Sequence, residues 1–349
     1  MLGGIEVLAS DLRPLRVKSP RPYSHAVAKS VAAGHRIRIV TGYFGVESVI
    51  ELIGILQANP LDREVTFTVG MAAFDGLTHT QIDALKKLDK YLAETQQGQV
   101  LICVALPVHS KISSFKMGDG VHQVIVGSSN FTNLISGVRQ FETDLLLDGD
   151  SEAGSKIVDL ISEIERTADP LAVAEKRIKI LKAKLPSLAA ERDVEPATPV
   201  SGEVVAEFRL PIKTEPKSSL NAYFGKGRVD SKGRILPRPW YEVELIVSKT
   251  ITTQPNYPQH DEVISVITDD GWKFNCHTTG DYAKNFRSHG NLEILGKWIK
   301  GRLEEFGALQ PGNPVTDEVL ENYGNDELRL IKYLDGTWSL NFPPMKGEK

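Results

Sequence analysis

Apolar positions along the first half of the chain follow two alternating patterns. Continuous apolar runs at residues 36–41, 64–70 and 99–106 are typical of buried strands. Residues 46–57 and 78–95 lie between these runs and carry apolar stripes with the helical period. Because buried strands that alternate with helices are typical of parallel sheets, we expect an α/β domain at the N-terminal end.

The next segments predict an antiparallel hairpin added to that sheet. Strands are expected at residues 111–117, 122–127 and 143–148, with the turn Gly118-Asp119-Gly120 between the first two, and helices at residues 151–166 and 171–185. We therefore expect a first domain over residues 1–185, built as a mixed sheet flanked by helices.

Residues 186–203 are charged, contain prolines and have few large apolar side chains, so they predict a linker. Its acidic residues Glu191, Asp193 and Glu195 suggest a plug over a site that binds phosphate. Beyond it, strands are expected at residues 241–247, 262–268 and 338–342, and helices at residues 292–306 and 317–322. Residues 204–349 therefore predict a mostly β second domain.

Length and composition support two globular domains. The chain has 349 residues, more than one core usually organises, and 41% of them are hydrophobic. No apolar run is long enough to span a bilayer, and no secretory signal is visible, so we expect a cytoplasmic protein without membrane contact. Cys103 and Cys276 stand far apart, which excludes a disulfide framework and a zinc finger. A net charge of −4 means that any surface for nucleic acid must be local.

Five residues at predicted strand ends have the chemistry for phosphodiester cleavage. His109 and Lys111 are two residues apart on a strand and therefore share one face. Lys111, Ser128 and Asn130 can hold the nonbridging oxygens of a phosphate, so that His109 attacks phosphorus. Glu142 is our candidate acceptor for the other nitrogen of His109, fixing its tautomer.

Two other interpretations of these residues stay open. His109 is an ordinary strand-end histidine in the first, with Gly127-Ser128-Ser129-Asn130 as a plain turn. His109, Asp119 and His122 bind a metal in the second, although their spacing is not that of a metal site. We expect no metal and no other cofactor.

The motif His-x-Lys at 109–111, followed by Gly-Ser-x-Asn at 127–130, resembles the signature of the phospholipase D superfamily. One departure is Lys116, which stands where many members have an aspartate. The superfamily pairs two such motifs, and this chain has one. The resemblance therefore implies a homodimer through the N-terminal domain, in which one His109 attacks and the other protonates the leaving oxygen.

Two segments of the second domain are candidates for DNA binding. Residues 223–240 carry the cations Lys226, Arg228, Lys232, Arg234 and Arg238 against one acid, Asp230, with interleaved glycines. Residues 273–288 offer the side chains Lys273, Asn275, His277, Thr278, Tyr282, Lys284, Asn285 and Arg287. Arginine can bind guanine and asparagine adenine in the major groove. Ordinary solvated loops remain the alternative for both segments.

Two arms on a β domain resemble the B3-like DNA-binding domains, a pseudobarrel fold. The whole arrangement resembles the NgoAVII, CglI and BfiI group of restriction endonucleases. This resemblance implies cleavage of double-stranded DNA at a short specific sequence without a metal, and a cognate methyltransferase as partner. For part of this group it also implies an ATP-dependent helicase-like subunit. Because this chain has no Gly-x-x-x-x-Gly-Lys-Ser/Thr loop, that ATPase would be a separate protein.

Two other functional classes stay open. The first is a nonspecific phospholipase D-type nuclease or a phospholipid phosphodiesterase, although no amphipathic membrane helix is evident. The second is a DNA-binding module whose first domain only dimerises. Lipid turnover without DNA cleavage would favour a lipid enzyme, and a trapped phosphohistidine would reject the binding module.

Overall fold

The computed structural model describes residues 5–10, 12, 15, 17–18, 21–132, 134, 140–181, 186–189, 191–215, 219–230 and 233–344. The chain forms two compact units. The first comprises Met1–Ala183 with Gly227–Pro237, and the second comprises Lys184–Lys226 with Arg238–Lys349. Gly227–Pro237 therefore packs with the first unit, although the sequence pattern placed this segment in the second domain.

The first unit is built on a mixed eight-stranded sheet with the order β1-β8-β7-β6-β2-β3-β5-β9. Its strands are β1 (Glu6–Ala9), β2 (Gly34–Thr41), β3 (Glu64–Val69), β5 (Gly98–Cys103), β6 (Ile112–Met117), β7 (His122–Gly127), β8 (Thr143–Asp148) and β9 (Ala168–Pro170). The strands β2, β3 and β5 are parallel, and the other neighbours pair antiparallel. The predicted change from parallel strands to a hairpin is confirmed.

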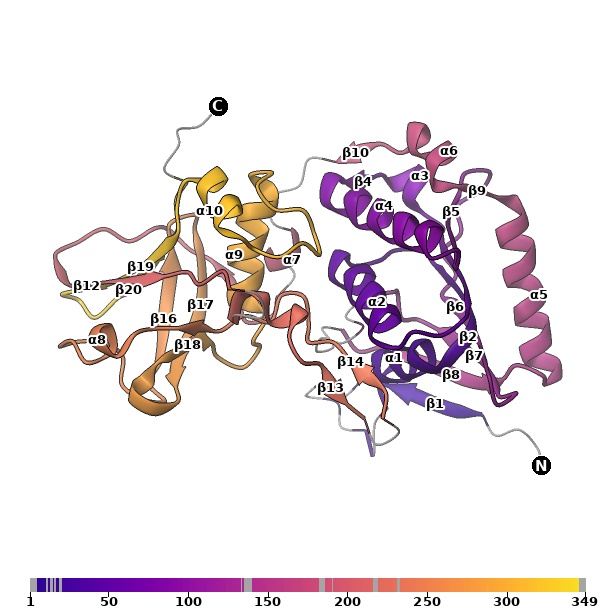
Figure 1. Cartoon of the computed structure of the whole chain (residues 1–349), viewed down its shortest axis with the longest axis horizontal. Helices are drawn as coiled ribbons and strands as arrows, with labels where there is room; N and C mark the ends of the chain where they lie inside the picture. Colours follow the sequence, from indigo (N-terminus) through magenta and orange to yellow (C-terminus); the bar gives the residue numbers. More distant parts are fainter. Residues whose placement is uncertain are drawn as a thin grey trace. The chain divides into compact units, whose positions relative to one another are not determined.

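Helices cover the two faces of this sheet unequally (Figure 1). One face is covered by α1 (Tyr23–Ala33), α2 (Val46–Ala58) and α4 (His79–Glu94), and the other by α5 (Glu152–Thr167). A capping box of Thr78 and Gln81 starts α4. On the side of α5, Ile161 packs with Val40 and Ile112 of the sheet.

One predicted helix of the first domain is wrong. Residues 171–181 form only the short α6 (Leu171–Ala174) and a 3-10 turn, after which β10 (Ile180–Leu181) pairs in parallel with β4 (Leu77–Thr78). The amide of Leu77 donates to the carbonyl of Lys179 at 2.9 Å, so sheet pairing outweighs local helix propensity there. Residues 182–185 lie outside the described part of the chain. The elements β1 and α1 were not predicted.

The second unit is a strand-rich sheet around one buried helix, α9 (Ile294–Glu305). Its strands are β12 (Val204–Pro211), β15 (Leu245–Ile246), β16 (Val263–Thr268), β17 (Trp272–Thr279), β18 (Asn285–Ser288), β19 (Glu327–Tyr333) and β20 (Trp338–Asn341), in the order β12-β19-β20-β16-β17-β18-β15. Trp298 of α9 packs against Phe274 and Phe342. The predicted helices and two of the three predicted strands are confirmed, whereas residues 241–247 form only the two-residue β15.

Much of the predicted linker is anchored in the second unit. The carboxylate of Glu191 forms a buried ion pair with Lys297 of α9 at 2.6 Å. Residues Glu195–Pro196 form β11, which pairs with β17. Glu191 therefore has its ionic partner within the second unit. No helix among the described residues is long and apolar enough to cross a membrane.

Candidate active site and DNA interface

The predicted catalytic residues gather where neighbouring strands end. Lys111 directly precedes β6, Asn130 follows β7 and Glu142 directly precedes β8. Since these three strands are adjacent and antiparallel, their connections meet at one edge of the sheet. An open pocket of about 520 Å³ lies there, lined by His109, Ser110, Lys111, Ile112, Val126, Gly127, Ser128 and Asn130.

The contact between His109 and Lys111 determines which tautomer a neutral His109 imidazole adopts. The Nζ of Lys111 lies 3.0 Å from the Nε2 of His109. An ammonium group has no lone pair, so it donates and Nε2 accepts. A neutral His109 therefore carries its proton on Nδ1 and has its nucleophilic lone pair on Nε2. Burial lowers the pKa of Lys111, and the carboxylate of Glu142 opposes this by favouring the charged ammonium.

Two glycines let the backbone carry His109 close to the sheet. A Cβ at Gly42 would lie 2.8 Å from Cδ2 of His109, and a Cβ at Gly70 would lie 1.8 Å from the carbonyl oxygen of Val108. The ring of Tyr43 meets the imidazole edge to face, with 5.4 Å between ring centroids. The Tyr43 hydroxyl donates to Asp75 at 2.5 Å, and this bond raises the pKa of Tyr43. These contacts fix the position of the His109 imidazole.

A buried carboxylate holds the Gly-Ser-Ser-Asn turn. Asp144 accepts the Ser129 amide at 3.0 Å and the Ser129 hydroxyl at 2.6 Å. Gly127 makes this possible, since a Cβ there would lie 2.2 Å from Oδ1 of Asp144. Burial raises the pKa of Asp144, and the two bonds from Ser129 oppose the rise. Sequence reasoning gave Asp144 no role, although its position two residues after Glu142 on a buried strand is a signal for it.

Asn130 has one side of its amide occupied. Its Oδ1 accepts the backbone amide of Tyr43 at 3.3 Å. The NH₂ group of the side chain is then the end that is left to donate, as binding of a phosphate oxygen requires. The backbone N–H of Tyr43 can only donate, so the atom of the Asn130 amide that faces it is the oxygen.

The structure pairs Glu142 with Ser128 instead of His109. The Ser128 hydroxyl donates a hydrogen bond to the Glu142 carboxylate and accepts one from the backbone amide of Thr143 at 3.1 Å. The expectation that Glu142 accepts a bond from His109 is therefore corrected. Its contact with Ser128 and its effect on Lys111 place its charge beside these two side chains.

The residues of the alternative metal cluster do not converge. His122 is hydrogen-bonded to Ser114 at 2.9 Å and to Asp150 at 3.0 Å, while Asp119 bonds to the amide of Val121 in the turn. Within the described ranges, no three His, Cys, Asp or Glu side chains are placed to hold one ion.

In the second unit, the segment 273–288 is a β-hairpin with two distinct faces. The strands β17 and β18 place Lys273, Asn275 and His277 on the outward face, where His277 lies opposite Arg287. Asn285 lies at the start of β18, and Lys284 and the exposed Tyr282 lie in the connection between the strands. Thr278 differs, because it is buried and donates to the carbonyl of Gln259 at 2.5 Å. Its hydroxyl supports the fold of the hairpin.

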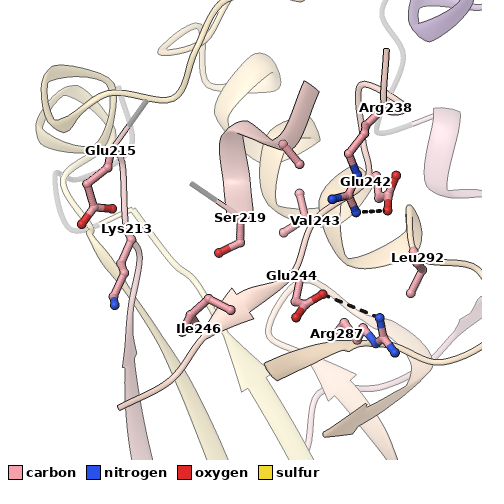
Figure 2. A pocket seen from close by; sticks show the side chains of 11 residues that line it. Lys213, Glu215, Ser219, Arg238, Glu242, Val243, Glu244, Ile246, Arg287 and Leu292 are labelled. Carbon is pink, nitrogen blue, oxygen red and sulfur yellow. Dashed lines mark hydrogen bonds and ion pairs between the residues drawn. The ribbon is translucent and has the colours of Figure 1, made fainter. Parts of the chain in front are cut away.

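A pocket of about 520 Å³ brings the two predicted segments together (Figure 2). Arg238 comes from the first segment and Arg287 from the second. Glu242 binds Arg238, and Glu244 lies 3.6 Å from Arg287, so each guanidinium faces a carboxylate of the same short stretch. The Nε atoms of both arginines are buried without a hydrogen-bond partner. Such donors and acceptors beside the apolar Val243 and Leu292 suit the edge of a nucleobase.

The other cations of the first segment are placed differently. Lys226 and Arg228 are exposed, whereas Arg234 is largely buried in an ion pair with Asp230 at 2.6 Å. Lys232 lies outside the described residues. The structure therefore divides this predicted arm between a pocket of the second unit and a hairpin of the first.

Comparison with known families follows the division of the chain. The sequence model of the NgoFVII restriction endonuclease N-terminal PLD domain matches residues 24–175. The model of the NgoFVII C-terminal B3-like DNA-binding domain matches residues 200–334. No curated protein sequence matches the chain.

Solved structures resemble the chain over about half of its length. The phospholipase D family member Nuc from Salmonella typhimurium is 12% identical, with a TM-score of 0.36, and the match covers 48% of this chain and 97% of Nuc. NucT from Helicobacter pylori is 14% identical, with a TM-score of 0.33, covering 48% and 99%. Phosphatidylserine synthase from Haemophilus influenzae is 13% identical, with a TM-score of 0.33, covering 52% and 42%.

Proposed function

Because the chain belongs to the NgoFVII family of restriction endonucleases, with a phospholipase D-type nuclease domain and a B3-like DNA-binding domain, we propose that it cuts double-stranded DNA at a short specific sequence. We propose that cleavage needs no divalent metal and passes through a phosphohistidine in a composite dimer site. The observation that carries the proposal is the placement of His109 Nε2 within 3.0 Å of Lys111 Nζ in an open pocket.

The reaction divides between two histidines. When DNA binds, the Lys111 ammonium donates its hydrogen bond to a phosphate oxygen instead of to Nε2 of His109. The lone pair on Nε2 is then free. This nitrogen attacks phosphorus, an N–P bond forms and a P–O bond of the DNA breaks. The leaving oxygen takes a proton from His109 of the second subunit. The same histidine then deprotonates the water that hydrolyses the N–P bond.

The charges on the phosphate are met by protein groups. Lys111 supplies a full positive charge, and the amide of Asn130 supplies a donor that is held by Tyr43. These groups support cleavage without an ion. Digestion of a sequenced plasmid in EDTA tests this, and a requirement for magnesium would contradict it.

An apolar row across the sheet supports pairing of two subunits. Val40, Ile112, Val126, Leu145 and Val7 lie side by side on the face that α5 covers. Their exposure rises outward along the row, from 1% at Val40 and 7% at Ile112 to 38% at Leu145 and 60% at Val7. Because Ile112 and Val126 also line the His109 pocket, a second copy that covers this row would bring its own motif to the pocket.

Subunit mixing tests the composite site. His109→Ala protein is mixed in increasing proportion with the unsubstituted protein at constant total concentration, with subunits allowed to exchange. One shared site predicts activity that falls with the square of the unsubstituted fraction. A linear fall would mean that each subunit works alone.

The pocket with Arg238 and Arg287 supports sequence-specific binding. Arginines held in position by carboxylates keep a fixed geometry for hydrogen bonds to base edges. Mapping the ends from the plasmid digest separates this proposal from a nonspecific nuclease, which would give scattered ends. Parallel incubation with phospholipid vesicles tests lipid hydrolysis.

Two partners and a location belong with this proposal. We propose that a separate ATP-dependent helicase-like subunit and a cognate methyltransferase work with this cytoplasmic enzyme. Cleavage by the purified chain alone, unaffected by ATP or a co-expressed ATPase, would contradict the proposal of a helicase-like subunit.

A further inference from the structure

A small hairpin from the second half of the sequence is packed on the first unit. Its strands are β13 (Arg228–Val229) and β14 (Ile235–Leu236), and it lies beside α1 and α2 (Figure 1). Both flanks of the hairpin belong to the second unit. This element therefore returns to the nuclease unit from a part of the chain that otherwise builds the DNA-binding unit.

One side chain of α2's C-terminal end holds the hairpin by two hydrogen bonds. Nδ2 of Asn59 donates to the carbonyl of Ile235 at 2.8 Å, and the amide of Ile235 donates to Oδ1 of Asn59 at 3.1 Å. The amide group thus pairs with the strand as a neighbouring backbone would. Asn59 is itself fixed, since it also donates to the carbonyl of Ile55 at 2.9 Å. The receptor for the hairpin is therefore already in position.

In the docked hairpin, Arg234, which the sequence predicts to bind DNA, already has hydrogen-bond partners. Arg234 pairs with Asp230 at 2.6 Å and donates to the carbonyl of Lys29 at 3.2 Å. A guanidinium in these contacts is not presented to a phosphate. In the docked position, the bond to the Lys29 carbonyl therefore competes with binding of a phosphate by Arg234.

The exposure of the hairpin and the charges around Arg234 favour its release from α1 and α2. Val229 and Ile235 are 60% and 37% exposed, and two-stranded hairpins of this size are marginal on their own. Arg234 also lies among like charges: burial lowers the pKa of His25, and Lys29, Arg21 and Arg234 lower it further while Asp230 opposes them. A polyanion that approaches would compete with the Lys29 carbonyl for Arg234.

The docking site also lies at the opposite edge of the sheet from His109. The strand β2 runs toward the active-site edge, and α2 returns from there to end at Ala58, directly before Asn59. Contact with the hairpin therefore does not cover the catalytic pocket.

We propose that α1 and α2 form a docking site for the segment Gly227–Pro237, and that the docked hairpin withholds Arg234 until duplex DNA competes for it. This rests on the proposed function for the identity of the competitor. The docked position is the resting state, and the released hairpin adds a contact to the DNA backbone.

Hydrogen exchange followed by mass spectrometry tests the proposal on the full chain. Asn59→Ala removes both bonds to Ile235. Thr95→Ala is the matched control, because Thr95 ends α4 and bonds to the carbonyl four residues back at 2.8 Å, as Asn59 does in α2. In the free protein we expect peptides over 228–236 to exchange about tenfold faster in Asn59→Ala alone, since a protecting hydrogen bond is lost.

The same samples with a 30-base-pair duplex test release. We expect the unsubstituted hairpin to reach the exchange rate of Asn59→Ala once DNA is bound, and Asn59→Ala to bind duplex several-fold more tightly by fluorescence anisotropy. Asn59→Asp, which keeps the acceptor but loses the donor, should lie between the two. This variant preserves the test if Asn59→Ala fails to fold.

Different results refute different parts. Equal exchange in free Asn59→Ala and Thr95→Ala would overturn the docking site, whatever DNA does. Bound duplex with a hairpin that stays protected, and no gain in affinity for Asn59→Ala, would overturn the release. Failure of every variant to bind duplex would refute the proposed function, while exchange in the free protein still decides the docking.

Discussion

The predicted catalytic motif and the first basic segment are held in different ways. Lys111, Asn130 and Glu142 are fixed by a ladder of adjacent strands, so their separation follows from the pairing of β6, β7 and β8. The basic segment has no such ladder. Part of it is anchored by Asn59 and Lys29, and Arg238 lies in a pocket of the second unit.

The two regions therefore differ in how far their geometry is fixed before DNA binds. A site on paired strand ends keeps its geometry in the free protein, as electrostatic stabilisation of a transition state requires. A segment held by a few polar contacts is able to exchange partners. Substitutions in the first region should therefore remove activity, and those in the second should change affinity.

The largest effect is expected for His109→Ala. Loss of the nucleophile should lower cleavage by about 10⁴-fold or more, as for other nucleophiles that act as one unit with their neighbours. Single-turnover cleavage measures it, and sedimentation and DNA binding should be unchanged. Substantial residual cleavage would mean that another group attacks phosphorus.

A smaller loss is expected for Asp144→Ala, which frees the Gly-Ser-Ser-Asn turn. The Ser129 amide and hydroxyl lose their acceptor, so Asn130 is misplaced and kcat should fall about 10²-fold. Stability should also fall by about 1–3 kcal/mol, because buried donors become unsatisfied. Asp150→Asn, at an exposed carboxylate, is the control; equal losses in both variants would remove the special role of Asp144.

Arg287→Ala tests whether the second unit reads bases. We expect specific binding to weaken by about 1–3 kcal/mol, with less discrimination against altered sequences. Arg228→Ala, on the exposed hairpin, should instead weaken binding to all duplexes and reduce the salt slope by about one. Salt titrations on specific and random duplexes measure both. The same response from both variants would contradict the distinction.

A modest shift of the pH profile is expected for Glu142→Gln. Burial lowers the pKa of Lys111 and Glu142 raises it, so loss of the carboxylate lowers it further. The ammonium is then lost at lower pH, and the alkaline fall of kcat/KM should move to lower pH. An alkaline limb that stays in place or moves upward would show that Lys111 does not control it.

The smallest effect concerns stability in the second unit. Burial lowers the pKa of Lys300 from an ordinary value of 10.5 to about 7, although its Nζ donates to the carbonyl of Trp240. Between these values the unfolded chain binds a proton that the folded chain lacks, so the free energy of unfolding rises with pH. Urea denaturation at pH 7 and pH 9 measures this slope, which should diminish in Lys300→Met. An unchanged slope would assign it to other groups.

The parts predicted from sequence are those set by local periodicity. Most strands of the first unit followed from apolar runs, and the proximity of His109 and Lys111 followed from their two-residue spacing. The matched family models confirm the fold class. Tertiary contacts decided the rest. Lys179 joins a strand pair instead of a helix, Glu191 finds Lys297 across the unit, and Asn59 holds a hairpin 176 residues away in sequence. No local pattern encodes such distant partners.

Trapping a covalent intermediate tests whether His109 attacks phosphorus without a metal. Duplex DNA with a labelled phosphate at the cleavage site is mixed with the protein in EDTA and quenched in alkaline detergent, which preserves N–P bonds. We predict label on the protein at His109, absent from His109→Ala. Cleavage that starts only with a divalent metal, without label at His109, would contradict the account.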